Sequence, residues 1–175
     1  MTPFTLRPFT PDDIPSLAIA GNNPNISGNL TNRFPHPYTE EHAAAFIQMA
    51  GSTDPVRIFA IDIGGQVAGG IGIHPQEDIW HNNAELGYWV AEPFWGQGIV
   101  TEAIRRMLDF AFTRLPNKRI FARPFGRNIA SQKALERNGF ILEARLTGTI
   151  EKNGNVEDEL IYRIWRHEWE QKTIG

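Results

Sequence analysis

A glycine-spaced loop that opens a helix constrains the fold of this chain more than any other feature of its sequence. The loop, Trp95-Gly96-Gln97-Gly98, follows an apolar and aromatic stretch at Ala84 to Ala91 that predicts a strand. The helix after it, Gly98 to Leu115, has apolar residues at helical spacing and stops at Pro116. Without side chains at the two glycines, backbone N–H groups at the helix start can converge on an anion. The pattern therefore indicates a mixed α/β fold and a candidate phosphate site, with a purely structural turn as the alternative.

Two familiar nucleotide-binding motifs are excluded at this loop. The ATP-binding P-loop needs a lysine and then Ser or Thr after its last glycine, but Gly98 is followed by Ile99-Val100. The dinucleotide fingerprint needs a further glycine at position 101, which is Thr101. A second glycine run, Gly69 to Gly72, lies inside a predicted strand, where close backbone packing or a bulge is the better explanation.

The remaining segments alternate between predicted strands and helices, without repeats or linkers. Gly64-Gly65 and Asn153-Gly154 are typical of tight hairpins. Thr10-Pro11 and Thr39 are typical helix starts. The Asn-, Pro- and Gly-rich stretch from Gly21 to Tyr38 predicts either a short helix or a functional loop. The other predicted strands are Thr5 to Phe9, Val56 to Ile63, Gln66 to Ile73, Arg119 to Ala122, Phe140 to Glu151 and Val156 to Trp165, and a further helix spans about Asn128 to Asn138.

Length, charge and composition limit the class of protein. A chain of 175 residues suits one domain, residues 1–175, with a single core. The formal charge is −3 and the basic residues are scattered, so we expect neither nucleic-acid nor membrane binding, and a cationic partner suits the surface better. The absence of cysteine excludes disulfides and thiolate chemistry, and the five histidines show no metal-binding spacing. Met1 to Pro15 lacks a signal-peptide pattern, which predicts a cytoplasmic protein.

Three motifs along the chain carry a resemblance to a known family. The first runs from Ala84-Glu85-Leu86-Gly87-Tyr88-Trp89-Val90 to the loop and helix start at Trp95 to Ala103. The second is Asn128-Ile129-Ala130-Ser131 with Leu135-Glu136-Arg137-Asn138-Gly139-Phe140, and the third is the tail from Asp158 to Trp169. In this order and spacing they resemble the GNAT acetyltransferase superfamily, and in particular the branch that includes the ribosomal-protein N-terminal acetyltransferases.

The resemblance implies a fold and a cofactor. The fold is α/β (α+β), a mixed, mostly antiparallel, twisted sheet of about six or seven strands flanked by about four helices. Its central strands, Ala84 to Ala91 and Arg119 to Ala122, would splay apart and hold acetyl-CoA as co-substrate, without a metal. Backbone groups near Trp89 and Val90 would pair with the pantetheine arm. The resemblance also implies cofactor contacts from Gln97, Gly98, Val100 and Thr101, whose amides would hold the pyrophosphate, and from Asn128 and Ser131, which would reach the arm from the other side.

Two departures from the family pattern bear on individual contacts and on catalysis. Trp95 and Val100 stand where the general superfamily loop has Arg or Gln and Gly or Ala. Leu135 stands where the family commonly has a tyrosine that acts as general acid. Ser131 is the best replacement for this acid, because it lies one helical turn beyond Asn128 and thus on the same face. The alternative for Ser131 is a serine that satisfies the helix end.

An amine must lose a proton before it attacks a thioester, and Glu85 is our candidate for the base, acting through water. In a strand, Glu85 shares a face with Gly87 and Trp89, and Gly87 would leave room beside it. The alternative is a glutamate that pairs with a basic residue in the sheet. A backbone N–H near Val90 would stabilise the oxyanion, as the resemblance implies. The helix dipole explains Glu102, in the first turn of its helix.

Several aromatic and histidine residues have two interpretations. Trp80, Phe94 and Trp95 suit packing in the core, with a pocket wall as the alternative. His74 and His81 flank a predicted loop that could border an acceptor groove, although surface histidines are commoner.

The sequence thus predicts an N-acetyltransferase that acts on a primary amine. The acceptor is either a peptide N-terminus, as on a ribosomal protein, or a small molecule such as a polyamine, an amino acid or an aminoglycoside. A CoA-binding sensor without catalytic activity is the competing class. The loops from Gly21 to Tyr38 and from Pro75 to Asn83 would select the acceptor. A homodimer stays open as an assembly.

Overall fold

The computed structural model describes residues 2–174, and side-chain exposure through residue 171. Met1 and Gly175, the ends of the predicted domain 1–175, lie outside the described residues. The chain divides into two units, each built from two segments. The first contains Met1–Gly72 and Tyr88–Ala103, and the second contains Ile73–Gly87 and Ile104–Gly175. That residues 1–175 form one domain stays a prediction.

The strands are hydrogen-bonded in the order β1-β2-β3-β4-β5-β7-β6. Neighbours β1–β2, β2–β3, β5–β7 and β6–β7 are antiparallel, and β4–β5 are parallel. The expected mixed, mostly antiparallel sheet is therefore confirmed, with seven strands. The strands are β1 (Thr5–Pro8), β2 (Ile58–Ile63), β3 (Gln66–Pro75), β4 (Asn83–Val90), β5 (Arg119–Ala122), β6 (Ile141–Lys152) and β7 (Asn155–Trp165).

Six α-helices occur among the described residues, two more than expected. The additions are α2, within the stretch predicted as a short helix or a loop, and α6, at the end of the chain. The helices are α1 (Ile14–Gly21), α2 (Pro24–Ser27), α3 (Glu40–Ala50), α4 (Ile99–Arg114), α5 (Ile129–Arg137) and α6 (Arg166–Ile174), with short 3-10 turns η1 (Pro11–Asp13), η2 (Asp78–Trp80) and η3 (Glu92–Phe94).

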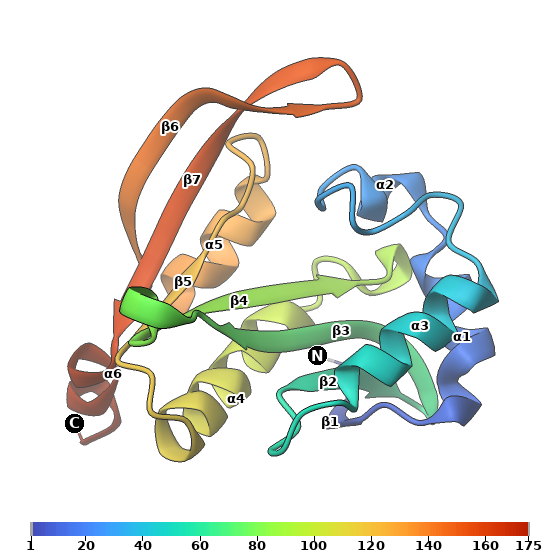
Figure 1. Ribbon diagram of the computed structural model, residues 1–175, viewed down its shortest axis with the longest axis horizontal. Helices are drawn as coiled ribbons and strands as arrows, with labels where there is room; N and C mark the ends of the chain where they lie inside the picture. The colour runs from blue at the N-terminus through green and yellow to red at the C-terminus, as the bar shows by residue number, and fades with distance from the viewer. Residues whose placement is uncertain (1, 175) are drawn as a thin grey trace. The chain divides into compact units, whose positions relative to one another are not determined.

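The core of the first unit lies between helices α1 and α3, which are side by side, and strands β2 and β3 (Figure 1). These helices face the sheet because their apolar residues recur at helical spacing. The buried residues of this core are Leu17, Ala18, Tyr38, Ala43, Ile47, Ala60 and Val67. Trp89 and Phe34 pack against this cluster, so the side chain of the predicted pantetheine-strand residue Trp89 is part of the core.

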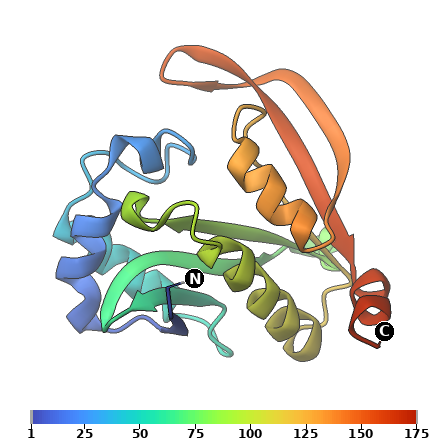
Figure 2. The ribbon, with the colours of Figure 1, turned by 180° about the vertical axis from the view of Figure 1, so that it is seen from behind.

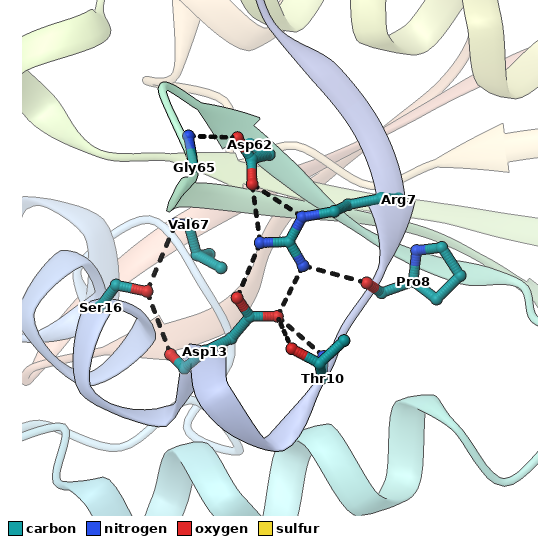
Figure 3. A network of polar contacts seen from close by, with 8 residues as sticks. All are labelled: Arg7, Pro8, Thr10, Asp13, Ser16, Asp62, Gly65 and Val67. Atoms are coloured by element: carbon teal, nitrogen blue, oxygen red, sulfur yellow. Dashed lines mark hydrogen bonds and ion pairs between the residues drawn. The ribbon is translucent and has the colours of Figure 1, made fainter.

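A polar network joins three elements of the first unit (Figure 3). Arg7 on β1 donates from Nε to Asp62 Oδ2 at 2.7 Å and from Nη1 and Nη2 to the Asp13 carboxylate at 2.8 and 2.7 Å. Ser16 Oγ donates to the Asp13 carbonyl and accepts from the Val67 N–H. The network thereby ties β1, the start of α1 and the β2–β3 hairpin together.

The second unit contains the long β6–β7 hairpin, with α5 beside it in both views (Figures 1 and 2). Asn153 and Gly154, at φ 53° and 77°, make its tight turn, as predicted. Tyr162 on β7 donates to Glu136 Oε1 on α5 at 2.9 Å. Burial, and then this bond to Glu136, raise the pKa of Tyr162 to about 12.

Candidate active site

The loop before α4 has the backbone geometry expected of a glycine-spaced anion cradle. Gly96 and Gly98 lie in the left-handed region, at φ 71° and 78°, which other residues adopt only with strain. A Cβ placed on Gly96 would have no heavy atom within 4 Å, so this side of the loop is open. The Glu102 N–H donates to the Gly98 carbonyl at 3.1 Å, the bond that opens α4. Backbone amides of Gln97, Gly98 and the first turn therefore lie at the positive end of a helix dipole.

Side chains of the first unit form hydrogen bonds that stabilise this loop. Trp95 Nε1 donates to the Val90 carbonyl at 2.7 Å, and Gln97 Nε2 donates to the Pro93 carbonyl at 3.0 Å. Gln97 Oε1 also accepts from Thr2 Oγ1 at 2.5 Å. These bonds give Trp95 a specific structural task, although it departs from the family pattern.

Strand β3 approaches β4 very closely at Trp89 and Val90. A Cβ on Gly69 would lie 2.3 Å from the Trp89 carbonyl oxygen and 2.9 Å from Val90 Cα. Only glycine fits at position 69, which confirms close backbone packing as the reason for this glycine of the run. The register of β2 against β3 also shifts between Ile61 and Asp62, as at a bulge.

Glu85, the candidate base, is held by an arginine. Arg123 Nε and Nη2 donate to the two oxygens of the Glu85 carboxylate at 3.0 and 2.9 Å. Arg123 Nη1 also lies 3.5 Å from Glu159 Oε1. The hydrogen bond to Glu85 raises the pKa of the Arg123 guanidinium. The ion pair with a basic residue, which the sequence left as an alternative, is therefore present, and a proton relay through Glu85 would have to operate beside it.

The His74 ring borders the space at Gly87, beside Glu85. A Cβ on Gly87 would meet His74 Nε2 at 3.5 Å and His74 Cδ2 at 3.8 Å, both ordinary van der Waals contacts. The two residues come close because β3 and β4 are neighbours in the sheet, and both belong to the second unit. An imidazole therefore lies next to the position that the sequence predicts to be open.

Asn128 and Ser131 are joined at the start of α5. Asn128 is the N-cap, and its Oδ1 accepts from the Ser131 N–H at 3.1 Å. The Ser131 side chain is half-buried. Leu135, one turn further along α5, is fully buried, at 0% exposed, and belongs to the core. The position of the family tyrosine thus points into the protein interior in this chain.

The core-packing interpretation is wrong for two of the three aromatic residues. Trp80 is 60% exposed and Trp95 is 44% exposed, because both lie on short turns at the surface. Phe94 is half-buried and lines a cavity of about 760 Å³ within the first unit. Among the described residues, none of the predicted site residues lines this cavity, which is bounded by α1, the β2–β3 turn and the segment that leads into the loop.

The predicted site residues fall in both units. Trp89, Val90, Gln97, Gly98, Val100 and Thr101 belong to the first unit, and Glu85, Asn128 and Ser131 belong to the second. The residue that sequence reasoning missed is Arg123. Arg123 comes close to Glu85 because Glu85 pairs with Phe121 in the parallel register of β4 and β5, and Arg123 lies two residues after Phe121. The sequence alone does not reveal this register.

The structure between residues 2 and 174 has no helix long and apolar enough to cross a membrane. The described part of the chain likewise holds no group of three or more His, Asp or Glu side chains arranged to bind a metal ion.

Comparison with known proteins identifies the class. The sequence pattern of the acetyltransferase (GNAT) domain matches residues 4–141. The chain therefore belongs to the GNAT acetyltransferase family.

Solved structures share the fold. A GNAT-family acetyltransferase from Bacillus anthracis superimposes with a TM-score of 0.80 at 20% identity, over 94% of this chain and 96% of that one. RimL, the ribosomal L7/L12 alpha-N-protein acetyltransferase, in a complex with coenzyme A, gives a TM-score of 0.82 at 22% identity, over 94% and 95%. At these identities the similarity establishes the fold alone.

Two relatives in sequence differ in the acceptor that their names state. The provisionally named ribosomal N-acetyltransferase YdaF of Bacillus subtilis (strain 168) is 33% identical over 106 residues, 61% of this chain and 57% of that protein. Spermidine N(1)-acetyltransferase of Escherichia coli (strain K12) is 23% identical over 178 residues, 97% of this chain and 91% of that protein. The chain spans about half the length of the Bacillus relatives it matches, between 49% and 57%.

Proposed function

We propose that this protein transfers an acetyl group from acetyl-CoA to a primary amine. The observation that carries the proposal is the loop Trp95-Gly96-Gln97-Gly98, with both glycines in the left-handed conformation at the start of α4. Membership of the GNAT family supports the assignment of this loop to the cofactor. The complex of RimL with coenzyme A supports the same cofactor on this fold.

The loop suits the pyrophosphate of acetyl-CoA. Its open side at Gly96 leaves space for phosphate oxygens, and the α4 dipole favours their negative charge. We assign the pyrophosphate to the amides of Gln97, Gly98, Val100 and Thr101. The pantetheine arm is assigned to backbone groups of Trp89 and Val90 and to Asn128 and Ser131, as the family resemblance implies.

Acetyl-CoA supplies the thioester, and this chain would supply proton handling and charge stabilisation. The amine nitrogen attacks the thioester carbonyl, the carbon–sulfur bond breaks, and CoA leaves as the thiolate. Glu85 is assigned to take the amine proton through water, with His74 beside Gly87 as a second candidate. A backbone N–H near Val90 would stabilise the oxyanion, and the Ser131 hydroxyl would hydrogen-bond to the departing sulfur. A non-catalytic CoA sensor would need none of these groups.

We further propose that the acceptor is a peptide α-amine. The provisionally named ribosomal N-acetyltransferase YdaF supports a peptide, since it is 33% identical over 106 residues, whereas the spermidine enzyme is 23% identical over 178 residues. The spermidine enzyme, which matches nearly the whole chain, keeps a small polyamine as the second candidate. The cytoplasmic location, the lack of nucleic-acid and membrane partners, and a homodimer stay predictions from the sequence.

A panel of amines tests the acceptor. Release of the CoA thiol is measured with acetyl-CoA and one of four amines: a peptide with a free N-terminus, the same peptide with a blocked N-terminus, spermidine and a free amino acid. We expect the highest kcat/KM for the free peptide and no turnover of the blocked peptide. A higher kcat/KM for spermidine would replace the peptide by a polyamine and leave the acetyl-transfer proposal intact.

A further inference from the structure

Glu92 binds two asparagines of the α2 segment, residues 22–30. Its Oε2 atom accepts from Asn23 Nδ2 at 2.7 Å and from Asn25 Nδ2 at 3.0 Å. Hydrogen bonds from Asn23 and then Asn25 lower the pKa of the Glu92 carboxyl, so this carboxylate is the form that the two amides stabilise. Glu92, Asn23 and Asn25 all belong to the first unit.

Asn23 uses both ends of its side-chain amide. The oxygen accepts from the Asn25 N–H at 2.8 Å and caps α2, while the nitrogen donates to Glu92. The cap needs only the side-chain oxygen, because Asn and Asp cap helices equally well. The second bond fixes the capped helix to Glu92 from the other end of the same amide.

The α2 segment is also anchored at its base. Ile26 is 3% exposed and buries one face of α2. Asn22 Oδ1 accepts from the Tyr38 N–H at 3.1 Å, which closes the stretch from Gly21 to Tyr38. Phe34 from that stretch stacks on Tyr38 with ring centroids 4.7 Å apart. The stretch therefore packs within the first unit, and Asn23 and Asn25 attach it to Glu92.

On its other side, Glu92 connects to the loop before α4. The Trp95 N–H donates to the Glu92 carbonyl at 3.0 Å, closing the turn η3. Gln97 Nε2 donates to the Pro93 carbonyl, and Trp95 Nε1 to the Val90 carbonyl. Hydrogen bonds and the short turn η3 thus connect the loop residue Gln97 with Glu92, whose carboxylate binds Asn23 and Asn25.

We propose that Glu92 is a positioning residue that couples occupation of the glycine loop to the order of the α2 segment. A ligand that fixes the loop also fixes η3 and Glu92, so that less entropy is lost when Asn23 and Asn25 bind the carboxylate. The inference deepens the proposed function and rests on it. Acetyl-CoA would bind first and order the α2 segment, which then selects the amine.

Amide hydrogen exchange in residues 24–30 of the full chain, with and without acetyl-CoA, tests the coupling. In the wild type, acetyl-CoA should slow this exchange. Asn23→Asp keeps the α2 cap, removes the donor and sets two carboxylates against each other. We expect exchange there to be about tenfold faster than in the wild type and insensitive to acetyl-CoA.

The double variant Asn23→Asp with Glu92→Gln exchanges donor and acceptor, since the new amide at position 92 can donate to the new carboxylate at position 23. It should restore the protection by acetyl-CoA, which a loss of folding or of the cap would not do. Glu41→Gln removes an exposed glutamate of α3 in the same unit and should leave both rates as in the wild type.

Kinetics give a second measurement at saturating acetyl-CoA. Asn23→Asp should raise KM for the acceptor about tenfold and leave kcat nearly unchanged. Equal protection of residues 24–30 by acetyl-CoA in the wild type and in Asn23→Asp would overturn the coupling, as would no rescue in the double variant. Calorimetry separates this failure from that of the proposed function: acetyl-CoA that binds without protecting residues 24–30 overturns only the coupling, and acetyl-CoA that does not bind overturns both.

Discussion

Arg7 lies between two buried carboxylates, and this arrangement makes the free energy of unfolding depend on pH. Asp13 is 5% exposed and Asp62 is 8% exposed. Hydrogen bonds from Arg7 hold the pKa of Asp13 below its ordinary value of 3.8. As pH falls from that value, the unfolded chain takes up the proton first. The contribution of Asp13 is therefore complete above the ordinary value and is lost as pH falls through the lowered pKa.

Asp13→Asn should lower the free energy of unfolding by about 1.5–3 kcal/mol at pH 7, because it removes charge-assisted hydrogen bonds. The difference from the wild type should shrink as pH falls below about 4. Urea unfolding across pH measures both. Asp109→Asn, at an exposed i,i+4 pair with Arg105, is the control, with an expected loss of about 0.5 kcal/mol. A pH-independent difference for Asp13→Asn would contradict the assignment.

If Glu85 relays the amine proton, Glu85→Gln should lower turnover about a hundredfold and flatten the rise of rate with pH. Glu159→Gln is the matched control, since Glu159 Oε1 lies 3.5 Å from Nη1 of the same Arg123. It should leave the pH profile unchanged. Wild-type turnover in Glu85→Gln would return Glu85 to a structural ion pair, and a flattened profile in His74→Gln would transfer the role to His74.

Ser131→Ala should lower turnover about ten- to a hundredfold with little change in acetyl-CoA affinity, because it deletes a hydrogen bond to a charge that develops on sulfur. The cap from Asn128 uses the Ser131 backbone N–H, which alanine retains. The α5 start should therefore persist, as checked by circular dichroism. Weak acetyl-CoA binding with normal turnover at saturation would instead limit Ser131 to contact with the pantetheine arm and leave water as the acid.

At the scale of elements, the role of the loop before α4 in binding acetyl-CoA can be tested by substituting Gly98. A glycine with the same backbone conformation in another turn, Gly154, serves as the control. Gly98 and Gly154 have φ of 78° and 77°, and valine is strained at both. Gly98→Val should also cover the loop amides and raise KM for acetyl-CoA about tenfold or more. Gly154→Val, on the β6–β7 turn, should lower stability alone. An equal KM in both variants would remove the loop from the cofactor site.

The elements that the sequence predicts well are those fixed by local chemistry. Gly64-Gly65 and Asn153-Gly154 form the expected turns because both residues of each pair have positive φ. The helix predicted from Gly98 to Leu115 spans Ile99–Arg114, since its apolar stripe and Pro116 determine it locally. The strand Arg119 to Ala122 also has the predicted bounds, although its partners β4 and β7 lie far along the chain.

The parts that the sequence did not predict depend on partners far along the chain. Arg123 meets Glu85 only through strand register, and His74 lies beside Gly87 only because β3 and β4 are neighbours. Trp95 lies at the surface, where its indole nitrogen binds the Val90 carbonyl. Apolar character alone cannot reveal such a bond. The Glu92 contacts with the α2 segment are hidden for the same reason.

At the scale of the whole molecule, fold and function are specified to different degrees. Proteins that share the fold at 20–22% identity give TM-scores of 0.80 and 0.82. The names of two relatives nevertheless state different acceptors, one a provisionally named ribosomal N-acetyltransferase and the other a spermidine acetyltransferase. A shared fold therefore does not determine the acceptor, and we assign the choice of acceptor to surface segments such as residues 22–30.

The central claim is that this chain turns acetyl-CoA over in the presence of an amine. The most direct measurement follows free CoA thiol and the acetylated peptide together, with a peptide that has a free N-terminus. We expect thiol release to depend on the peptide and to equal the amount of acetylated product. Acetyl-CoA that binds and yields neither thiol nor product with any amine of the panel would contradict it and make the protein a CoA sensor.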